Sequence, residues 1–172
     1  MVDVGALVAG LPVGLCGVVF RHDGIADREA LGRRLAKICR ARRNVLVVAG
    51  DPKLAARLRA GLHLRGGRGR GKGGLVTSSA HNLMELSRAR RAGARIIFCS
   101  PVFATSSHPG ARGLGALGFA RLARHAGGAK AYALGGVDGV TIRRLGKDCA
   151  GAGAIDAFLC SAAKACYGVI SP

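Results

Sequence analysis

Residues that can bind an anion follow the ends of several short apolar segments in this chain. In chain order they are Arg21, Arg65, Arg68, Ser79, Thr105, Ser107, His108, Gly135 and Gly136. Guanidinium groups and hydroxyls donate strong hydrogen bonds to phosphate oxygens. Paired glycines let backbone N–H groups approach an anion, and a following helix adds its N-terminal dipole. The pattern therefore predicts a phosphate-binding site assembled from several segment ends.

Other histidines and serines near these positions have alternative roles. His22 and His81 lie in expected loops beside the site, so they are further candidates for function. His63 lies inside an apolar segment and is predicted to be a packed structural residue. Ser78 or Ser79 could cap the helix that follows instead of binding a ligand, because serine is a favoured N-cap residue.

The elements that must position these residues alternate between strand-like and helix-like segments. Expected strands cover residues 17–22, 44–50, 62–65, 75–79, 94–103, 129–136 and 153–160. Expected helices cover residues 27–43, 51–61, 80–93, 114–128, 137–148 and 161–168. Such alternation predicts one parallel α/β sheet with right-handed crossovers, in a single domain over residues 1–172. An open doubly wound sheet and a (βα) barrel both fit, and in both the site lies at the carboxyl ends of the strands.

The charge of the chain indicates an anionic partner. Lys and Arg total 27 against 9 Asp and Glu, for a net charge of +18. A phosphorylated small molecule and nucleic acid both fit, while a compositional bias toward Arg is the alternative. The segment 65–72 (RGGRGRGK) resembles an RGG-type nucleic-acid segment, but it has no interleaved aromatic residue and lies between two expected strands. Nucleic acid is therefore the less favoured partner.

Cysteine spacing and hydropathy predict a cytoplasmic protein. The six cysteines include no CxxC pair and no zinc-like spacing, which favours reduced thiols in the core. No apolar stretch reaches the ~18–20 residues that cross a bilayer, so no membrane association is expected. The N-terminal segment carries Asp3 and no basic start, which is a poor signal peptide.

Several motifs resemble the thiamine phosphate synthase and thiazole tautomerase superfamily. They are SSAH (78–81), FCSPVFATSSHPG (98–110), YALGG (132–136) and GAGAIDAF (151–158), with looser matches at 18–22, 47–55 and 61–65. The SPVFATSSHPG segment is the most specific and is similar to a branch with a Ser-His-Pro motif. The resemblance implies a (βα)8 TIM barrel and a transferase of thiamine biosynthesis. That enzyme joins a pyrimidine pyrophosphate to a thiazole phosphate, releasing pyrophosphate, with Mg2+.

The resemblance also implies roles for individual residues. Arg21 and Ser79 would contact the pyrophosphate, and His108 would stand where the family usually has a phosphate-binding Lys. Thr105 and Ser107 match hydroxyl positions near the thiazole phosphate. Gly135 and Gly136, with the backbone around 154–157, would hold that phosphate.

The sequence departs from the family pattern at several positions. Family residues that bind substrate or metal are replaced by Val19, Asp23, Ala49-Gly50, Arg68 and Asp156, and a tautomerase-type His is replaced by Pro101. The carboxylates expected to bind Mg2+ are therefore missing from their places. Arginines can also neutralise pyrophosphate. Our hypothesis is that the loop bearing Arg65, Arg68, Arg70 and Lys72 replaces the metal.

The first segment of the chain indicates an incomplete barrel. Residues 1–12 (MVDVGALVAGLP) are typical of the family's first helix rather than its first strand. Seven of the eight strands are therefore expected, which leaves a gap with exposed sheet edges. The N-terminal segment or a second copy of the chain could fill that gap, so a homo-oligomer is one expected arrangement.

Three functions remain open from the sequence. The first is the thiamine phosphate synthase-type transferase. The second is a catalytically impaired or repurposed family member that binds a phosphorylated ligand. The third is a basic nucleic-acid-binding protein.

Overall fold

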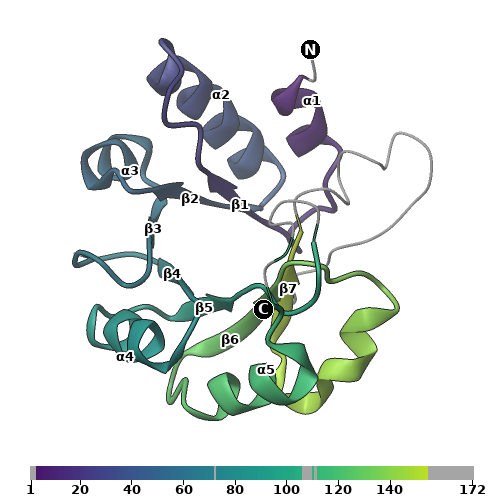
Figure 1. Ribbon diagram of the computed structural model, residues 1–172. Coiled ribbons are helices and arrows are strands. Elements are labelled where there is room, and N and C mark those ends of the chain that lie inside the picture. The colour runs from purple at the N-terminus through teal and green to yellow at the C-terminus, as the bar shows by residue number, and fades with distance from the viewer. Residues whose placement is uncertain (1–2, 72, 106–109, 111, 155–172) are drawn as a thin grey trace.

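Seven parallel strands form one curled sheet in the computed structural model, which describes residues 3–71, 73–105, 110 and 112–154 (Figure 1). They are β1 (Gly17–Phe20), β2 (Val45–Ala49), β3 (Gly61–Leu64), β4 (Val76–Ala80), β5 (Ile96–Cys99), β6 (Lys130–Leu134) and β7 (Gly151–Gly153). The strands pair in chain order from β1 to β7. This arrangement confirms the TIM-barrel-like α/β fold with seven strands.

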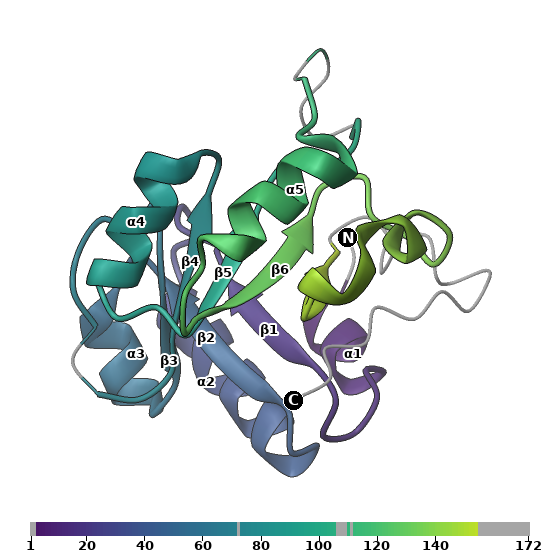
Figure 2. The same cartoon turned by 90° about the horizontal axis from the view of Figure 1, so that it is seen from below.

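The helices lie on the outer side of the curled sheet (Figures 1 and 2). They are α1 (Val4–Ala9), α2 (Arg28–Ala41), α3 (Pro52–Leu58), α4 (Leu83–Arg91), α5 (Gly115–Arg124) and the 3-10 helix η1 (Thr141–Asp148). Side-chain caps fix three of their starts, at Asp3, Asp51 and Asn82. In the part of the chain that the structure describes, no helix has the length and apolarity needed to cross a bilayer.

The core has two layers because side chains alternate across each strand. Outer-facing residues such as Phe20, Val48 and Ile97 pack with buried residues of the helices, including Leu35 and Phe119. A second buried set lies on the other face of the strands and includes His63, Thr77, Phe98 and Tyr132. Two ring contacts join this inner set, between His63 and Phe98 and between Phe98 and Tyr132.

The two ends of the sheet remain separate among the described residues. There β1 pairs only with β2, and β7 pairs only with β6. The first segment of the chain forms α1, as expected, and Arg34 of α2 contacts the capping carboxylate of Asp3 at 2.9 Å. Helix α1 therefore packs on α2 and adds no strand to the sheet.

Two expected strands differ most from their observed bounds. The segment 94–103 contributes only Ile96–Cys99, because Pro101 cannot donate a ladder hydrogen bond beyond that point. The last strand was expected at 153–160, whereas β7 covers Gly151–Gly153. Residues 155–172, which include the expected last helix, lie outside the described part.

The connection between β3 and β4 contains no helix in its described residues, as expected for this glycine-rich segment. The loop instead packs directly on α4. Gly67 has a φ of +71°, and a Cβ there would lie 2.4 Å from the backbone nitrogen of Ala89. The N–H of Gly67 also donates to the buried Ser78 hydroxyl at 2.9 Å. A glycine is therefore required at position 67, both by φ and by the close approach to α4.

Candidate functional site

The turn after β6 presents backbone N–H groups at the carboxyl end of the sheet. The carbonyls of Leu134 and Gly135 accept hydrogen bonds from Val102 and Phe103 at 2.9 and 3.0 Å. Within the described ranges, the N–H groups of Gly135 and Gly136 donate to no protein acceptor. Both glycines have positive φ, at +87° and +62°. Consecutive N–H groups in such a turn form a concavity suited to an anion.

The same turn is held rigidly against the segment after β5. A Cβ on Gly136 would lie 2.3 Å from the Ala104 carbonyl, so a side chain does not fit there. A Cβ on Gly135 would lie 3.7 Å from the Cγ2 of Thr105, which places Thr105 beside the turn. Downstream, Asp138 accepts hydrogen bonds from the N–H groups of Val140 and Thr141, and these bonds lower the pKa of its carboxyl group.

A network of arginines and carboxylates follows β1, β2 and β3 at the same edge of the sheet. The Arg28 guanidinium contacts Asp23 at 3.1 Å and Asp51 at 3.2 Å, and donates to the Ala49 carbonyl at 2.9 Å. Arg65 also pairs with Asp23. The Arg28 side chain is only 17% exposed. The network therefore fixes two guanidinium groups at the carboxyl ends of these strands.

Arg21 directly follows β1, and its charge acts on the layer of residues inside the sheet. His63 is buried in β3, and its Nδ1 lies 2.8 Å from the Thr77 hydroxyl. Burial, together with the charges of Arg21 and Arg65, lowers the pKa of His63 to about 4. His63 is therefore neutral near pH 7, and its burial confirms the structural role expected from the sequence.

Ser79 lies between the arginine network and the glycine turn, on β4. Its hydroxyl oxygen accepts the N–H of Gly66 at 3.1 Å, so the hydroxyl proton remains available for a ligand oxygen. Helix α4 is capped by Asn82, whose side chain accepts from Glu85 N–H. The alternative that Ser78 or Ser79 caps this helix is therefore wrong.

His81 adds a ring with a defined tautomer directly after β4. Its Nδ1 lies 2.6 Å from the Ser100 carbonyl, and because a carbonyl only accepts, Nδ1 carries the proton. This leaves Nε2 as the ring atom that can hydrogen-bond to a ligand. The backbone N–H of His81 donates to Glu85 at 2.9 Å, which ties the residue before the helix cap to the first turn of α4.

Comparison with known proteins agrees with this geometry. A family model described as thiamine monophosphate synthase matches residues 5–158. The chain belongs to the thiamine monophosphate synthase family. A similar solved structure is thiamine phosphate pyrophosphorylase from Pyrococcus furiosus, with a TM-score of 0.66 and 19% identity over 89% of this chain and 77% of that chain. At this identity the structural likeness supports the fold alone, and no curated protein sequence matches the chain.

The family suggests Mg2+, but the side chains at this edge do not fit a resident metal ion. Within the described ranges, no group of three or more His, Cys, Asp or Glu side chains could hold one. The two carboxylates nearest the expected position, Asp23 and Asp51, are both held by Arg28. A guanidinium group thus lies where a cation bound by these carboxylates would have to sit.

Not all of the expected residues belong to the arginine network as the structure describes it. Arg68 is exposed on the β3–β4 loop, next to Gly67 where the loop packs on α4. Ser107, His108, Lys72 and Asp156 lie outside the described residues. Of the four basic residues in the hypothesis of metal replacement, the structure places only Arg65 within the network.

Arg28 is the member of the site that sequence reasoning missed. It lies at the first position of α2, where the sequence pattern indicated only a charged residue of an amphipathic helix. Its partners Ala49 and Asp51 follow a different strand, more than twenty residues away. Only the parallel pairing of β1 with β2 brings them together, and no local pattern signals it.

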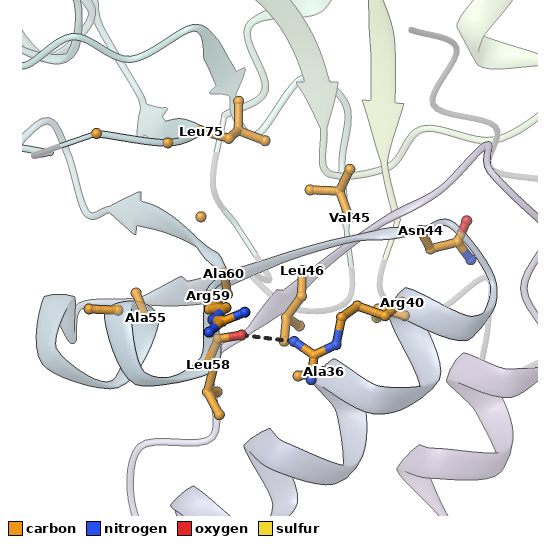
Figure 3. A pocket seen from close by; sticks show the side chains of 15 residues that line it. Ala36, Arg40, Asn44, Val45, Leu46, Ala55, Leu58, Arg59, Ala60 and Leu75 are labelled. Carbon is orange, nitrogen blue, oxygen red and sulfur yellow. Dashed lines mark hydrogen bonds between the residues drawn. The ribbon is translucent and has the colours of Figure 1, made fainter.

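A groove of about 600 Å3 lies at the opposite, amino-terminal edge of the sheet, between α2 and α3 (Figure 3). Its lining includes Ala36, Ala55 and Leu58, with Arg40 donating to the Leu58 carbonyl at 3.2 Å. Among the described residues that line the groove there is no histidine or carboxylate. We therefore assign the functional site to the carboxyl edge.

Proposed function

We propose that this chain is a thiamine phosphate synthase-type transferase that joins a pyrimidine pyrophosphate to a thiazole phosphate. One observation carries the proposal: the carboxyl edge of the sheet holds two separate anion-binding groups. The arginine network follows β1 to β3, and the Gly135–Gly136 turn follows β6. A reaction between two phosphorylated substrates needs two such groups at one edge.

The proposed step transfers a carbon from oxygen to nitrogen. The bond between the pyrimidine-bearing carbon and the pyrophosphate oxygen breaks, and its electron pair leaves with pyrophosphate. The thiazole nitrogen then donates its lone pair to that carbon. Arg21 and Arg65 stabilise the negative charge that develops on the leaving group, and the Ser79 hydroxyl donates a hydrogen bond to it. The N–H groups of Gly135 and Gly136 hold the thiazole phosphate, with Thr105 beside them.

We further propose that fixed guanidinium groups take the place of Mg2+ in binding the leaving group. Arg28 supports this because it forms ion pairs with Asp23 and Asp51, the carboxylates that a metal ion would need. Arg65 and Arg21 then supply charge-assisted donors at the same edge. Arg28 acts here as a positioning residue, because it holds Asp23, which in turn holds Arg65.

Isothermal calorimetry with inorganic pyrophosphate tests the binding part of the proposal. We expect binding that is unchanged when Mg2+ is replaced by a chelator. Arg21→Gln should weaken it about tenfold or more, because a hydrogen bond to a charged group contributes roughly 1.5–3 kcal/mol. Lys37→Gln is the matched control, since Lys37 is exposed on α2 and its loss removes the same charge. Absence of binding by the folded protein would disprove the proposal.

Release of pyrophosphate from the two substrates tests the chemistry. Turnover would support the transferase. Binding of both pyrophosphate and thiamine phosphate without turnover would instead support a repurposed member of the family. That is our second candidate function, because Arg28 pairs with the carboxylates that a metal ion would need.

A further inference from the structure

A long part of the chain carries positive charge without any carboxylate. Between Glu85 and Asp138 there is no Asp or Glu, and there are eight Arg or Lys residues. Seven of them cluster at the ends of α4 and α5 and at the starts of β5 and β6: Arg88, Arg90, Arg91, Arg95, Arg121, Arg124 and Lys130. We call these seven residues the α4–α5 cationic face.

Two contacts connect parts of this face. The N–H of Lys130 donates to the Arg95 carbonyl at 2.8 Å, so these residues are neighbours on adjacent strands. The Arg90 guanidinium donates to the His125 carbonyl at 3.0 Å, which connects the end of α4 with the end of α5. Both views show α4 and α5 next to one another (Figures 1 and 2).

The charges of the face are not neutralised within the described parts of the chain. The ion pairs found there involve arginines 28, 33, 34, 57 and 65, all from the first half of the chain. None of the seven cations of the face takes part in an ion pair with a described residue. Arg91, Arg95, Arg121 and Lys130 are also exposed to solvent.

The position of the face separates it from the proposed transferase site. Its residues lie at the carboxyl ends of helices and the amino ends of strands, which is the opposite edge of the sheet. Substrate phosphates at the carboxyl edge therefore do not account for it.

We propose that the α4–α5 cationic face binds the phosphate backbone of duplex nucleic acid, without sequence preference. Binding to phosphates needs only clustered arginines and lysines, and it requires no stacking ring. The large exposed apolar residues of these helices, Met84 and Leu117, lie in the first turns, away from the cations. A membrane-surface helix would instead place apolar side chains next to its cations. A protein interface would need an apolar centre, which the seven residues of the face do not supply.

The test measures binding of a fluorescent duplex of about 20 base pairs as the salt concentration is varied. The face variant carries Arg91→Gln, Arg95→Gln, Arg121→Gln and Lys130→Gln, and leaves out Arg90 because of its contact with α5. A matched control carries Lys37→Gln, Lys53→Gln, Arg143→Gln and Lys147→Gln, which removes the same charge from other exposed positions. Circular dichroism checks that both variants are folded.

The face variant should bind the duplex at least about tenfold more weakly, and its salt slope should fall by roughly 0.9 for each phosphate that it no longer neutralises. The control should keep most of the affinity and slope. Equal reductions in the two variants would overturn the proposal, because net charge alone would then explain binding. Loss of duplex binding in Arg21→Gln, with the face variant unaffected, would also overturn it, since the carboxyl edge would then be the binding site. So would binding to vesicles of anionic phospholipid with no binding to the duplex.

Discussion

Replacing Arg28 by Met tests whether a guanidinium group stands in for a metal ion at the carboxyl edge. Methionine keeps an apolar stem near Phe20, whose ring centroid lies 5.5 Å from the Arg28 Cζ. The change removes two partly exposed ion pairs, each contributing about 0.2–1 kcal/mol, and a charged hydrogen bond to Ala49 of roughly 1.5 kcal/mol. It also removes the buried Nε of Arg28, a polar atom that has no hydrogen-bond partner among the described residues.

The net destabilisation should be about 1–2 kcal/mol, which lowers Tm by roughly 2–8 °C in a domain of this size. The variant should also bind pyrophosphate more weakly, because Asp23 and Arg65 lose their fixed positions. Asp51 then has no arginine partner, so millimolar Mg2+ should raise the Tm of the variant more than that of the wild type. Thermal unfolding and calorimetry, each with and without Mg2+, measure these effects. Arg33→Gln is the control, since Arg33 is 71% exposed on the same helix. Unchanged pyrophosphate affinity in Arg28→Met, or equal Mg2+ effects in both proteins, would refute the reasoning.

Three further predictions concern the glycine turn, the β3–β4 loop and the buried histidine. Gly136→Ala should lower the affinity for thiamine phosphate, measured by calorimetry, by about tenfold, because its Cβ would displace the turn from the Ala104 carbonyl. Gly139→Ala is the control: it lies at an open position and should have no effect on affinity. Gly67→Ala should lower the free energy of unfolding in urea by about 2–4 kcal/mol, from backbone strain and the contact with α4, whereas Gly128→Ala should not. The unfolded chain binds a proton at His63 below about pH 6.5, whereas the folded chain does so only near pH 4. Stability should therefore fall as the pH drops from about 6.5 to about 4, by up to about 3 kcal/mol in urea unfolding, and His63→Gln should reduce that slope. Equal pH slopes in the two proteins would show that His63 is not the responsible group.

The order of elements could be predicted from the sequence because each element carries a local signal. Apolar β-branched runs such as 45–48 mark strands buried on both faces, and Asp51-Pro52 marks a helix start. The glycines of 66–74 likewise signalled a connection without a helix. Strand ends were less predictable. The β5 segment continues as apolar sequence past Cys99, and only the proline that follows shows where its ladder ends.

The sequence could predict only those site residues that lie at or directly after the end of a strand. Arg21, Arg65 and the Gly135–Gly136 pair follow strands in the sequence, Ser79 lies near the end of β4, and parallel pairing places them at one edge. Arg28 was not predictable, because its contacts depend on partners after two other strands. Arg68 lies only three residues beyond Arg65, and its N–H donates to the Arg65 carbonyl at 3.1 Å, but its side chain is exposed and takes part in no ion pair with a described residue. A role for Arg68 in phosphate binding therefore stays a prediction.

The helix dipoles affect which charged residues lie at each of the two edges of the sheet. Cations in the last turns of α2, α3, α4 and α5 interact favourably with the helix dipoles, so these arginines have a structural role at the amino edge without any ligand. At the carboxyl edge the same dipoles favour carboxylates near helix starts, such as Asp51 and Glu85. Arg28 is a cation at this edge, held by Asp51 and Asp23. Helix stability alone explains cations in the last turns, but it does not explain Arg95 and Lys130, which start strands. The dipoles of α4 and α5 do not account for these two residues. If Arg95 and Lys130 contribute to duplex binding, the cations of the amino edge bind a ligand as well as stabilising helices.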